Sequence, residues 1–179
     1  MKKIFMAVMA TAVLAVAAIN NAGAQLEFAK ASISELMYFD DSTTNPGMAN
    51  YSTSDLSTIN VRAVKNFQNA FKGANASWYR AEDGGYIANF KNGEVKNIVA
   101  YNAKGDLHHS ILYYGEKQLP ADVRASVKST YWDYSIAGVS EVHIDGQIIY
   151  MVLIQGETTI KMIRVCDGEM EEVKNDKKG

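Results

Sequence analysis

Hydrophobic and polar positions along the chain follow a helical period and then a strand period, and this order occurs twice. Apolar residues at three-to-four spacing predict a helix over 61–72 that ends at Gly73. Short runs then predict strands around Trp78 and over 86–90, 95–101 and 107–114. A second helix is predicted over 120–132, with strands over 139–144, 147–154, 159–166 and 169–173 behind it.

Cap and turn residues indicate how these elements connect. Asn60 can cap the first helix by accepting a hydrogen bond from a backbone N–H of its first turn, and Pro120 suits the first turn of the second. Asp145-Gly146 and Asp167-Gly168 are hairpin signals, because two-residue turns need positive φ at their central positions. Such short connections join antiparallel neighbours.

The two blocks match position by position within about a residue. The pairs are Phe71 and Tyr131, Tyr86 and Tyr150, Phe90 and Ile154, Tyr101 and Val165, and Gly105 and Gly168. We therefore predict an α+β fold: a tandem repeat of a helix and a three- to four-stranded antiparallel meander, with both helices on one face of a continuous sheet. The domain covers 60–175, with repeat one at 60–115 and repeat two at 119–175. Phe71 and Tyr131 are expected to be buried.

Alternation along the strands predicts which side chains face the helices. Tyr86, Ala88 and Phe90 match Tyr150, Val152 and Ile154, so both sets should face the helices. In the strand over 107–114 we assign Leu107 and Ile111 to the core. The opposite, open face of this strand then carries His108, Ser110, Leu112 and Tyr114, which we predict to be a protein-binding site.

The first 24 residues form a predicted signal peptide. Lys2 and Lys3 precede an apolar run over 4–19, and Ala22-Gly23-Ala24 is a small-x-small cleavage site that would leave Gln25 as the mature N-terminus. A membrane anchor is the alternative, but the run is shorter than the roughly 20 apolar residues of a spanning helix. No cysteine at the cleavage point marks a lipid anchor. We expect a periplasmic or secreted protein.

Residues 25–59 are the least regular part of the sequence. The stretch over 40–47 is rich in turn residues, and 33–39 could form a short strand or a helical turn. Asp41-Ser42-Thr43 also matches a short O-glycosylation signal of some Bacteroidota, although three-residue matches are common.

Composition excludes some functions. Without Lys2 and Lys3, 16 basic residues stand against 20 acidic ones and no basic patch stands out, which argues against nucleic-acid binding. The single cysteine, Cys166, cannot form an internal disulfide. It lies in an apolar run, and we interpret it as a small buried hydrophobic residue rather than a nucleophile.

The sequence contains no recognisable catalytic or metal motif. His108 and His109 are neighbours on a strand, so their side chains should point to opposite faces and not bind one ion together. There is no Gly-x-Ser-x-Gly turn. Cys166 could pair with His143 in principle, but nothing supplies a third group. Glu169, Glu171 and Glu172 are better explained as a solvated strand edge than as an acid–base pair. No cofactor is expected.

Several short motifs resemble one known family. They are Trp78, the run over 86–90 before an Asn-Gly turn, the stretch over 99–105, the stretch over 114–120, and Tyr131. In this order they resemble the secreted PepSY-like proteins of Bacteroidota, also described as β-lactamase-inhibitor-like, over roughly 61–174. Leu107 departs from the pattern, which usually has an aromatic residue there. The resemblance implies a tandem α/β module with a concave sheet, an envelope location and no known enzymatic activity.

The leading hypothesis is a non-enzymatic binding module. Its partner would be a protein or peptide of the cell envelope, for example a hydrolase that it restrains, held by the open sheet face. An open face that carries Tyr, His and Ser suits recognition, since Tyr combines a large rigid area with a polar tip. Two alternatives remain: a structural envelope protein without a specific ligand, and a hydrolase with an unrecognised carboxylate site.

Overall fold

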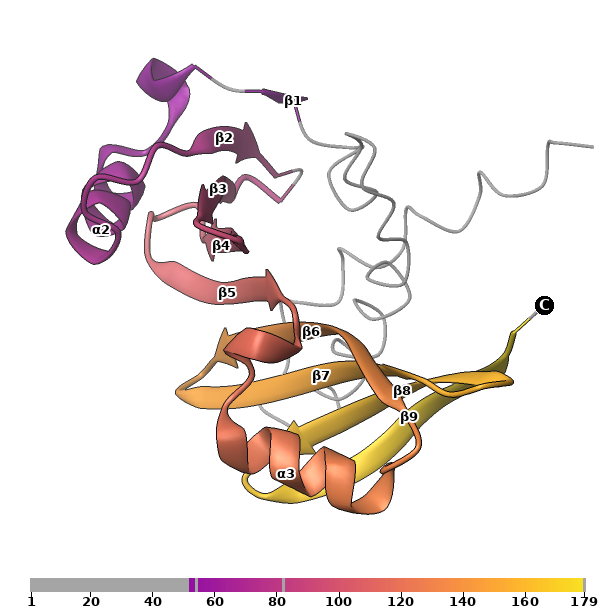
Figure 1. Ribbon diagram of the computed structural model, residues 1–179. Helices are drawn as coiled ribbons and strands as arrows, with labels where there is room; N and C mark the ends of the chain where they lie inside the picture. The colour runs from indigo at the N-terminus through magenta and orange to yellow at the C-terminus, as the bar shows by residue number, and fades with distance from the viewer. Residues whose placement is uncertain (1–51, 54, 82, 179) are drawn as a thin grey trace, which may run out of the picture.

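The computed structural model describes residues 52–53, 55–81 and 83–178 (Figure 1). The predicted signal peptide, most of segment 25–59 and the Asp41-Ser42-Thr43 motif lie outside the described residues. Among the described residues, no helix has the length and apolar character needed to cross a membrane.

One antiparallel sheet of nine strands, ordered along the chain, runs through the described protein. Its strands are β1 (Ser52–Thr53), β2 (Ser77–Arg80), β3 (Tyr86–Asn92), β4 (Val95–Tyr101), β5 (Leu107–Tyr114), β6 (Ser135–Ile144), β7 (Gln147–Gln155), β8 (Thr159–Cys166) and β9 (Glu169–Lys177). The two α-helices among the described residues are α2 (Val61–Ala70) and α3 (Ala121–Thr130). The predicted α+β class, with an antiparallel sheet and two helices, is confirmed. Strands β6 and β9 are longer than the sequence pattern predicted.

Both helices lie on the same face of this sheet. Residues that pair across neighbouring strands share a face, and one such row runs from Phe90 through Asn97, Leu112, Glu141 and Tyr150 to Val165. Phe90, at one end of the row, packs in the α2 cluster, and Val165, at the other end, packs in the α3 cluster. Figure 1 shows α2 beside β2–β4 and α3 against the C-terminal strands. We call the other side of the sheet the open face.

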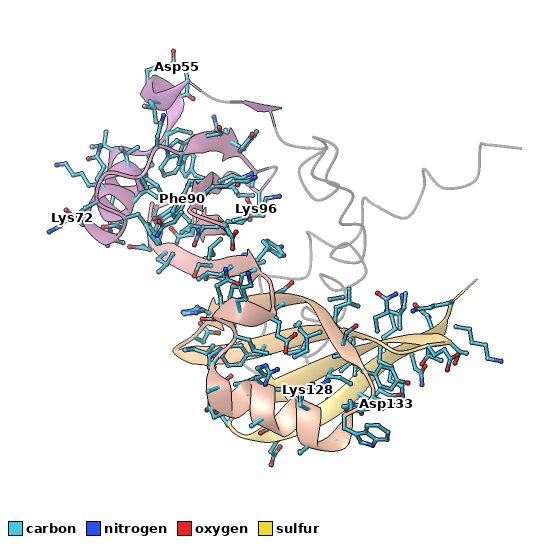
Figure 2. All side chains as sticks on the ribbon, in the orientation of Figure 1. Asp55, Lys72, Phe90, Lys96, Lys128 and Asp133 are labelled. Carbon is cyan, nitrogen blue, oxygen red and sulfur yellow. The ribbon has the colours of Figure 1, made fainter. Side chains whose placement is uncertain are left out.

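Helix α2 covers an aromatic core. Phe67 contacts Trp78 and Phe90 edge-on, with ring centroids 5.4 and 5.2 Å apart, and Trp78 stacks on Tyr101 at 5.8 Å. Figure 2 shows Phe90 on the α2 side of the sheet and Lys96 on the other. The buried residues of α2 are Ala63 and Phe67, whereas Val61 is 67% exposed.

The loop after β4 fixes the start of α2. Asn60 caps the helix as predicted, because its Oδ1 accepts from Arg62 N at 2.9 Å while its Nδ2 donates to Ala103 O. Gly105 has φ +83 and approaches so closely that a Cβ would lie 2.7 Å from Ala63 N. The glycine is required here by both its backbone conformation and its packing.

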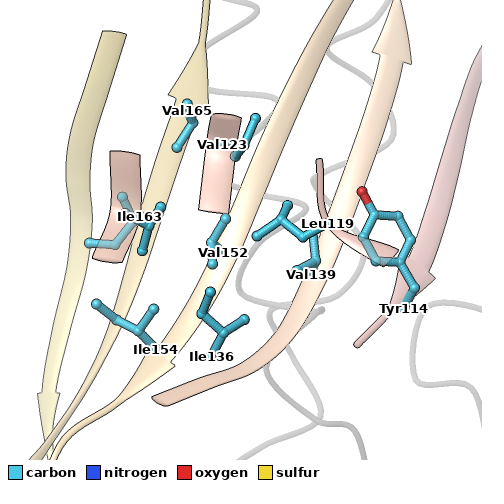
Figure 3. Packing of buried hydrophobic residues seen from close by; sticks show 10 residues of the cluster. Tyr114, Leu119, Val123, Ile136, Val139, Val152, Ile154, Ile163 and Val165 are labelled. Carbon is cyan, nitrogen blue, oxygen red and sulfur yellow. The ribbon is translucent and has the colours of Figure 1, made fainter. Parts of the chain in front are cut away.

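Helix α3 covers an aliphatic core of β6, β7 and β8 (Figure 3). Val127 is fully buried and Val123 is 7% exposed, and they pack over Val152, Ile154 and Ile163. The prediction that Tyr86, Ala88 and Phe90, and likewise Tyr150, Val152 and Ile154, face the helices is confirmed.

Phe71 and Tyr131 occupy matching positions at the helix ends. Each is the C-cap, with φ and ψ of −123° and 64° for Phe71 and −115° and 56° for Tyr131. Both are half-buried, so the expectation of full burial is wrong. Phe71 packs as a partly buried residue against the core under α2, and Tyr131 does the same against the core under α3.

Candidate functional site

A β-bulge in β5 decides which side chains face the helices. Tyr101 pairs with Leu107, but Ala100 pairs with His109, so His108 is an extra residue in the ladder. One extra residue moves every later side chain of a strand to the other face. Without the bulge, Ile111 would face the helices, as the alternation predicted. With it, Ile111 pairs with Ile98 on the open face.

Three of the four predicted binding residues are therefore not on the open face, and the fourth, His108, is the extra residue of the bulge. Tyr114 is 9% exposed and belongs to the core beneath α3, and Leu112 packs against the same core. Ser110 pairs with Val99, which faces α2. The assignment of Ser110, Leu112 and Tyr114 to the open face is wrong, because the bulge at His108 reverses the pattern. The assignment of Leu107 to the core is also wrong, because Leu107 is 60% exposed.

His108 and His109 also differ from the prediction. Their Nδ1 atoms lie 2.7 Å apart, although strand neighbours normally point to opposite faces. The bulge brings the two rings together. Burial, and secondarily the charge of His108, lowers the pKa of His109 to about 4. Within the described residues no third His, Cys, Asp or Glu joins them to form a metal-binding group.

The open face carries many apolar side chains, several of which are buried. Its central positions come from β3 to β8, and representative members are Ile87, Ile111, Val142, Ile149, Met151 and Met162. Four of these, Val142, Ile149, Met151 and Met162, belong to one cluster with Cys166. The sequence signal that could have found this surface is the apolar character of β7 on both of its faces.

One polar row crosses the open face. Lys91, Lys96 and Tyr113 stand at one end of it, and Arg164 and Glu171 at the other. Lys96 Nζ lies 5.8 Å from the centroid of the Tyr113 ring. Burial, followed by the charge of Lys91, lowers the pKa of Lys96. Arg164 Nε is buried and has no hydrogen-bond partner among the described residues. This face therefore offers apolar contact together with a donor that lacks an acceptor.

A second polar cluster lies on the helix side, at the junction of β5 and β6. Glu141 accepts a hydrogen bond from the Tyr114 hydroxyl and contacts His143 Nε2 at 2.5 Å. Burial, the hydrogen bond to Glu141 and the charge of Glu141 all raise the pKa of Tyr114. Ser110 is the Cα partner of His143 across the two strands. Cys166 is on the open face, so the Cys166–His143 pair does not form.

Solved structures from Bacteroides share this fold. A DUF2874 family protein from Bacteroides ovatus matches with a TM-score of 0.54 and 18% identity, over 69% of this chain and 89% of its own. A Bacteroides eggerthii protein, assigned provisionally to the periplasm, matches with a TM-score of 0.51 and 15% identity, over 66% and 88%. A BLIP-like protein from Bacteroides fragilis matches with a TM-score of 0.52 and 10% identity, over 65% and 84%.

These similarities establish the fold alone, because all three identities are low. The BLIP-like description agrees with the inhibitor-like part of the resemblance seen in the sequence, whereas the PepSY-like name is not used for these three proteins. No protein-family model and no curated protein matches the sequence.

Proposed function

We propose that this protein is a non-enzymatic binding module of the cell envelope that holds a protein or peptide partner on its open sheet face. The observation that carries the proposal is the apolar surface formed by β3 to β8, since none of the described helices covers it. Exposed apolar area on soluble proteins marks interaction sites, and the partly exposed apolar residues of this face include Ile98, Val142 and Leu153. The BLIP-like structural neighbour supports an envelope hydrolase as the partner.

The residues of the open face indicate which kind of partner would bind there. Ile98, Ile111 and Val142 offer flat apolar contact, and Lys96 and Arg164 offer positive charge. A carboxylate from the partner would satisfy the unpaired Nε of Arg164. The partner that fits best is an extended segment with alternating apolar and acidic residues.

The module is proposed to be a tandem repeat within a domain covering 60–175. A three-residue 3₁₀ turn directly precedes each half, at Leu56–Thr58 and Glu116–Gln118, and each half consists of a ten-residue helix and four strands. Both the turn and the helix recur at an offset of 60 residues. This regularity supports repeats at 60–115 and 119–175.

Capture from an envelope extract tests the proposed function, with mature residues 25–179 as bait. An Ile98→Asp variant places a charge on the open face, and Val61→Asp is the matched control on the exposed side of α2. We expect wild type and Val61→Asp to retain the same protein and Ile98→Asp to lose it. Equal capture by both variants, or no protein captured by the wild type, would refute the proposal.

One observation favours a hydrolase as the second candidate. Ser110, His143 and Glu141 lie together on the helix side, and a hydroxyl, an imidazole and a carboxylate are the groups that a serine hydrolase aligns. Turnover of a p-nitrophenyl ester that disappears in Ser110→Ala would support this candidate. Turnover that is equal in wild type and Ser110→Ala would exclude it.

A further inference from the structure

The two helices end with the same pair of backbone hydrogen bonds but carry different side chains there. The backbone N–H groups of Phe71 and Tyr131 each donate to the carbonyl four residues back, at 2.8 and 2.9 Å. Three positions later, Ala74 and Tyr134 donate to the carbonyls of these two cap residues, at 3.1 and 3.2 Å. The four side chains of the turn are Phe-Lys-Gly-Ala in repeat one and Tyr-Trp-Asp-Tyr in repeat two. Ending the helix in this way therefore requires no tryptophan.

Trp132 is the most exposed large hydrophobic residue of the described chain, at 78%. The matching position of repeat one holds Lys72, which is also exposed. One exposed apolar residue alone needs no explanation, but Trp132 stands in the chain between the aromatic residues Tyr131 and Tyr134. Its turn is also fixed, because Lys128 Nζ donates to the backbone carbonyls of Trp132, at 3.2 Å, and of Tyr134. A rigid indole is thus held in solvent without a part in the core.

The neighbouring rings of Tyr131 and Tyr134 are held in place by the strands beneath them. Their centroids lie 5.8 Å apart with the ring planes at 80°. Lys161 Nζ lies 5.5 Å from the centroid of Tyr131 and 5.6 Å from that of Tyr134, so one ammonium group contacts both rings. The Tyr134 hydroxyl shares a hydrogen bond with Thr159 Oγ1 at 2.7 Å. A Cβ at Gly156 would lie 2.8 Å from the Tyr134 ring, so this ring packs directly on the backbone.

Carboxylates border these rings. Glu172 accepts hydrogen bonds from Lys161 at 2.7 Å, from Asn175 at 3.0 Å and from the Tyr131 hydroxyl at 3.4 Å. A carboxylate has about four acceptor positions, so one remains for a ligand, and the Glu172 side chain is 33% exposed. Figure 2 shows Asp133, a second exposed carboxylate, just past the end of α3. Aromatic faces and hydrogen-bond acceptors therefore lie at the same end of this helix.

The surroundings of Trp132 suit a sugar ring better than a protein surface. A protein interface places further apolar residues around an aromatic anchor, where they exclude water. The exposed residues beside Trp132 in the chain are instead polar: Ser129, Thr130 and Asp133. A pyranose ring needs only one aromatic surface, because its C–H face carries partial positive charge and stacks on the negative face of the indole. Its hydroxyl groups, at the edge of the ring, then donate to nearby carboxylates.

We propose that Tyr131, Trp132 and Tyr134 form a saccharide-binding site at the C-terminal end of α3. The indole of Trp132 stacks on the C–H face of one sugar ring, and Glu172 and Asp133 accept hydrogen bonds from its hydroxyl groups. Tyr131 and Tyr134 pack against the core under α3, so the site is on the opposite side of the sheet from the open face. It does not depend on the function proposed above.

The charges at the site indicate a neutral sugar. The nearby ammonium groups are already engaged, since Lys128 bonds to two backbone carbonyls and Lys161 to Glu172. An acidic sugar would therefore find no available cation among these groups, and it would meet the carboxylates of Glu172 and Asp133. Neutral oligosaccharides such as cellotetraose, N-acetylated chitotetraose and mannotetraose are the matching probes, with tetragalacturonic acid as the acidic control.

Tryptophan fluorescence reports binding to the wild-type mature chain. The sequence has two tryptophans, and Trp78 is only 5% exposed, so a ligand from solution changes the emission of Trp132. We expect at least one neutral saccharide to change this emission with a dissociation constant of about 0.1–1 mM, and tetragalacturonic acid to have no effect.

Two matched variants separate the site from the fold. Trp132→Lys installs the residue that repeat one carries at the equivalent position, so its melting temperature should equal that of wild type. Its saccharide binding should be weaker by about tenfold or more. Lys72→Ala, at the equivalent position itself, should bind like wild type. NMR saturation transfer from the protein to the saccharide measures binding in both variants without the need for an indole.

Three results would overturn the saccharide site. The first is no binding by wild type to any of the neutral saccharides at about 10 mM, whether or not Trp132 is needed to capture an envelope protein. The second is equal binding by wild type and Trp132→Lys. The third is loss of saccharide binding in Ile98→Asp, which would place the ligand on the open face instead. Retention of binding in Ile98→Asp, together with loss of protein capture, is the result that supports two separate sites.

Discussion

At the scale of single residues, the bulge at His108 has the largest consequences. It places Tyr114 beneath α3, where the ring joins the core and the hydroxyl donates to Glu141. It also sets His108 against His109. Tyr114 is buried and His109 is partly buried, and each leads to a measurable effect.

Tyr114 should be a stability residue. Tyr114→Phe keeps the ring but leaves Glu141, whose side chain is 14% exposed, without one donor, so we expect a loss of about 1–2 kcal/mol in the free energy of unfolding. Tyr114→Ala also removes the ring from the core, at about 3–5 kcal/mol. Urea denaturation measures both, with Trp132→Ala as an exposed control near zero. A Tyr114→Ala protein as stable as wild type would show that the ring is not a core group.

His109 should make stability depend on pH. Burial lowers its pKa in the folded protein to about 4, from an unfolded value of about 6.5, so the unfolded chain binds more protons between these values. The contribution of neutral His109 is complete above about pH 6.5 and is lost as the pH falls toward 4, amounting to about 1–3 kcal/mol. Denaturation of wild type and His109→Gln across this window tests it. The profile should flatten in the variant, and identical slopes would contradict the assignment.

At the scale of elements, helix starts and tight turns are held by contacts that the local sequence encodes. Asp145 and Asp167 both adopt φ of 51°, each followed by a glycine of positive φ, as the hairpin signals predicted. The N-terminus of α2 depends in addition on a loop 40 positions later: Asn66 Nδ2 donates to Gly105 O at 2.9 Å and Arg62 pairs with Asp106 at 2.5 Å. The helix and the β4–β5 loop therefore form one unit.

Substitution of Gly105 tests this unit. Gly105→Ala meets both a positive φ and backbone atoms of α2 at 2.7 Å, whereas Gly93→Ala meets a positive φ with nothing within 4 Å of the added Cβ. We expect Gly93→Ala to lose about 1 kcal/mol from strain alone and Gly105→Ala to lose about 2–4 kcal/mol. Thermal or urea unfolding measures the difference. Equal losses would mean that the close approach to α2 is unimportant.

At the scale of the whole molecule, one sheet joins two separate helix-side cores. The aromatic core under α2 and the aliphatic core under α3 share no member. They are connected by the ladders of β4, β5 and β6. An open sheet built in chain order has few contacts between distant strands, so each core should protect its own strands.

Hydrogen exchange should reveal two units of stability. Phe67→Ala removes the centre of the aromatic core, at about 3–5 kcal/mol, and we expect faster exchange of backbone amides in β2–β4 with β6–β9 still protected. Val127→Ala, centred in the other core, is the matched variant and should do the reverse. A uniform rise in exchange across the sheet in either variant would indicate a single cooperative unit.

The sequence by itself determined the elements and their turns. The bounds of β4, β5 and β8, the Asn60 cap and both Asp-Gly hairpins followed from residues within a few positions of each other. Such features depend on local conformational preference and spacing, which one segment expresses without the rest of the chain. The helix-facing positions of β3 and β7 followed from the match between the two blocks, which aligned Tyr86, Ala88 and Phe90 with Tyr150, Val152 and Ile154.

Tertiary structure alone decided which face of β5 meets the helices. The sequence of β5 gives neither set of alternate positions a strong preference for the core. Both sets contain apolar or aromatic residues: Leu107, Ile111 and Tyr113 in one, and Leu112 and Tyr114 in the other. The pairing of β5 with β4, and the one extra residue that it accommodates at His108, determined which alternate residues of β5 face the helices. The same pairing therefore determined which residues could form the candidate site. A ladder register is set jointly by two strands and the core that they cover, so no single segment contains the information.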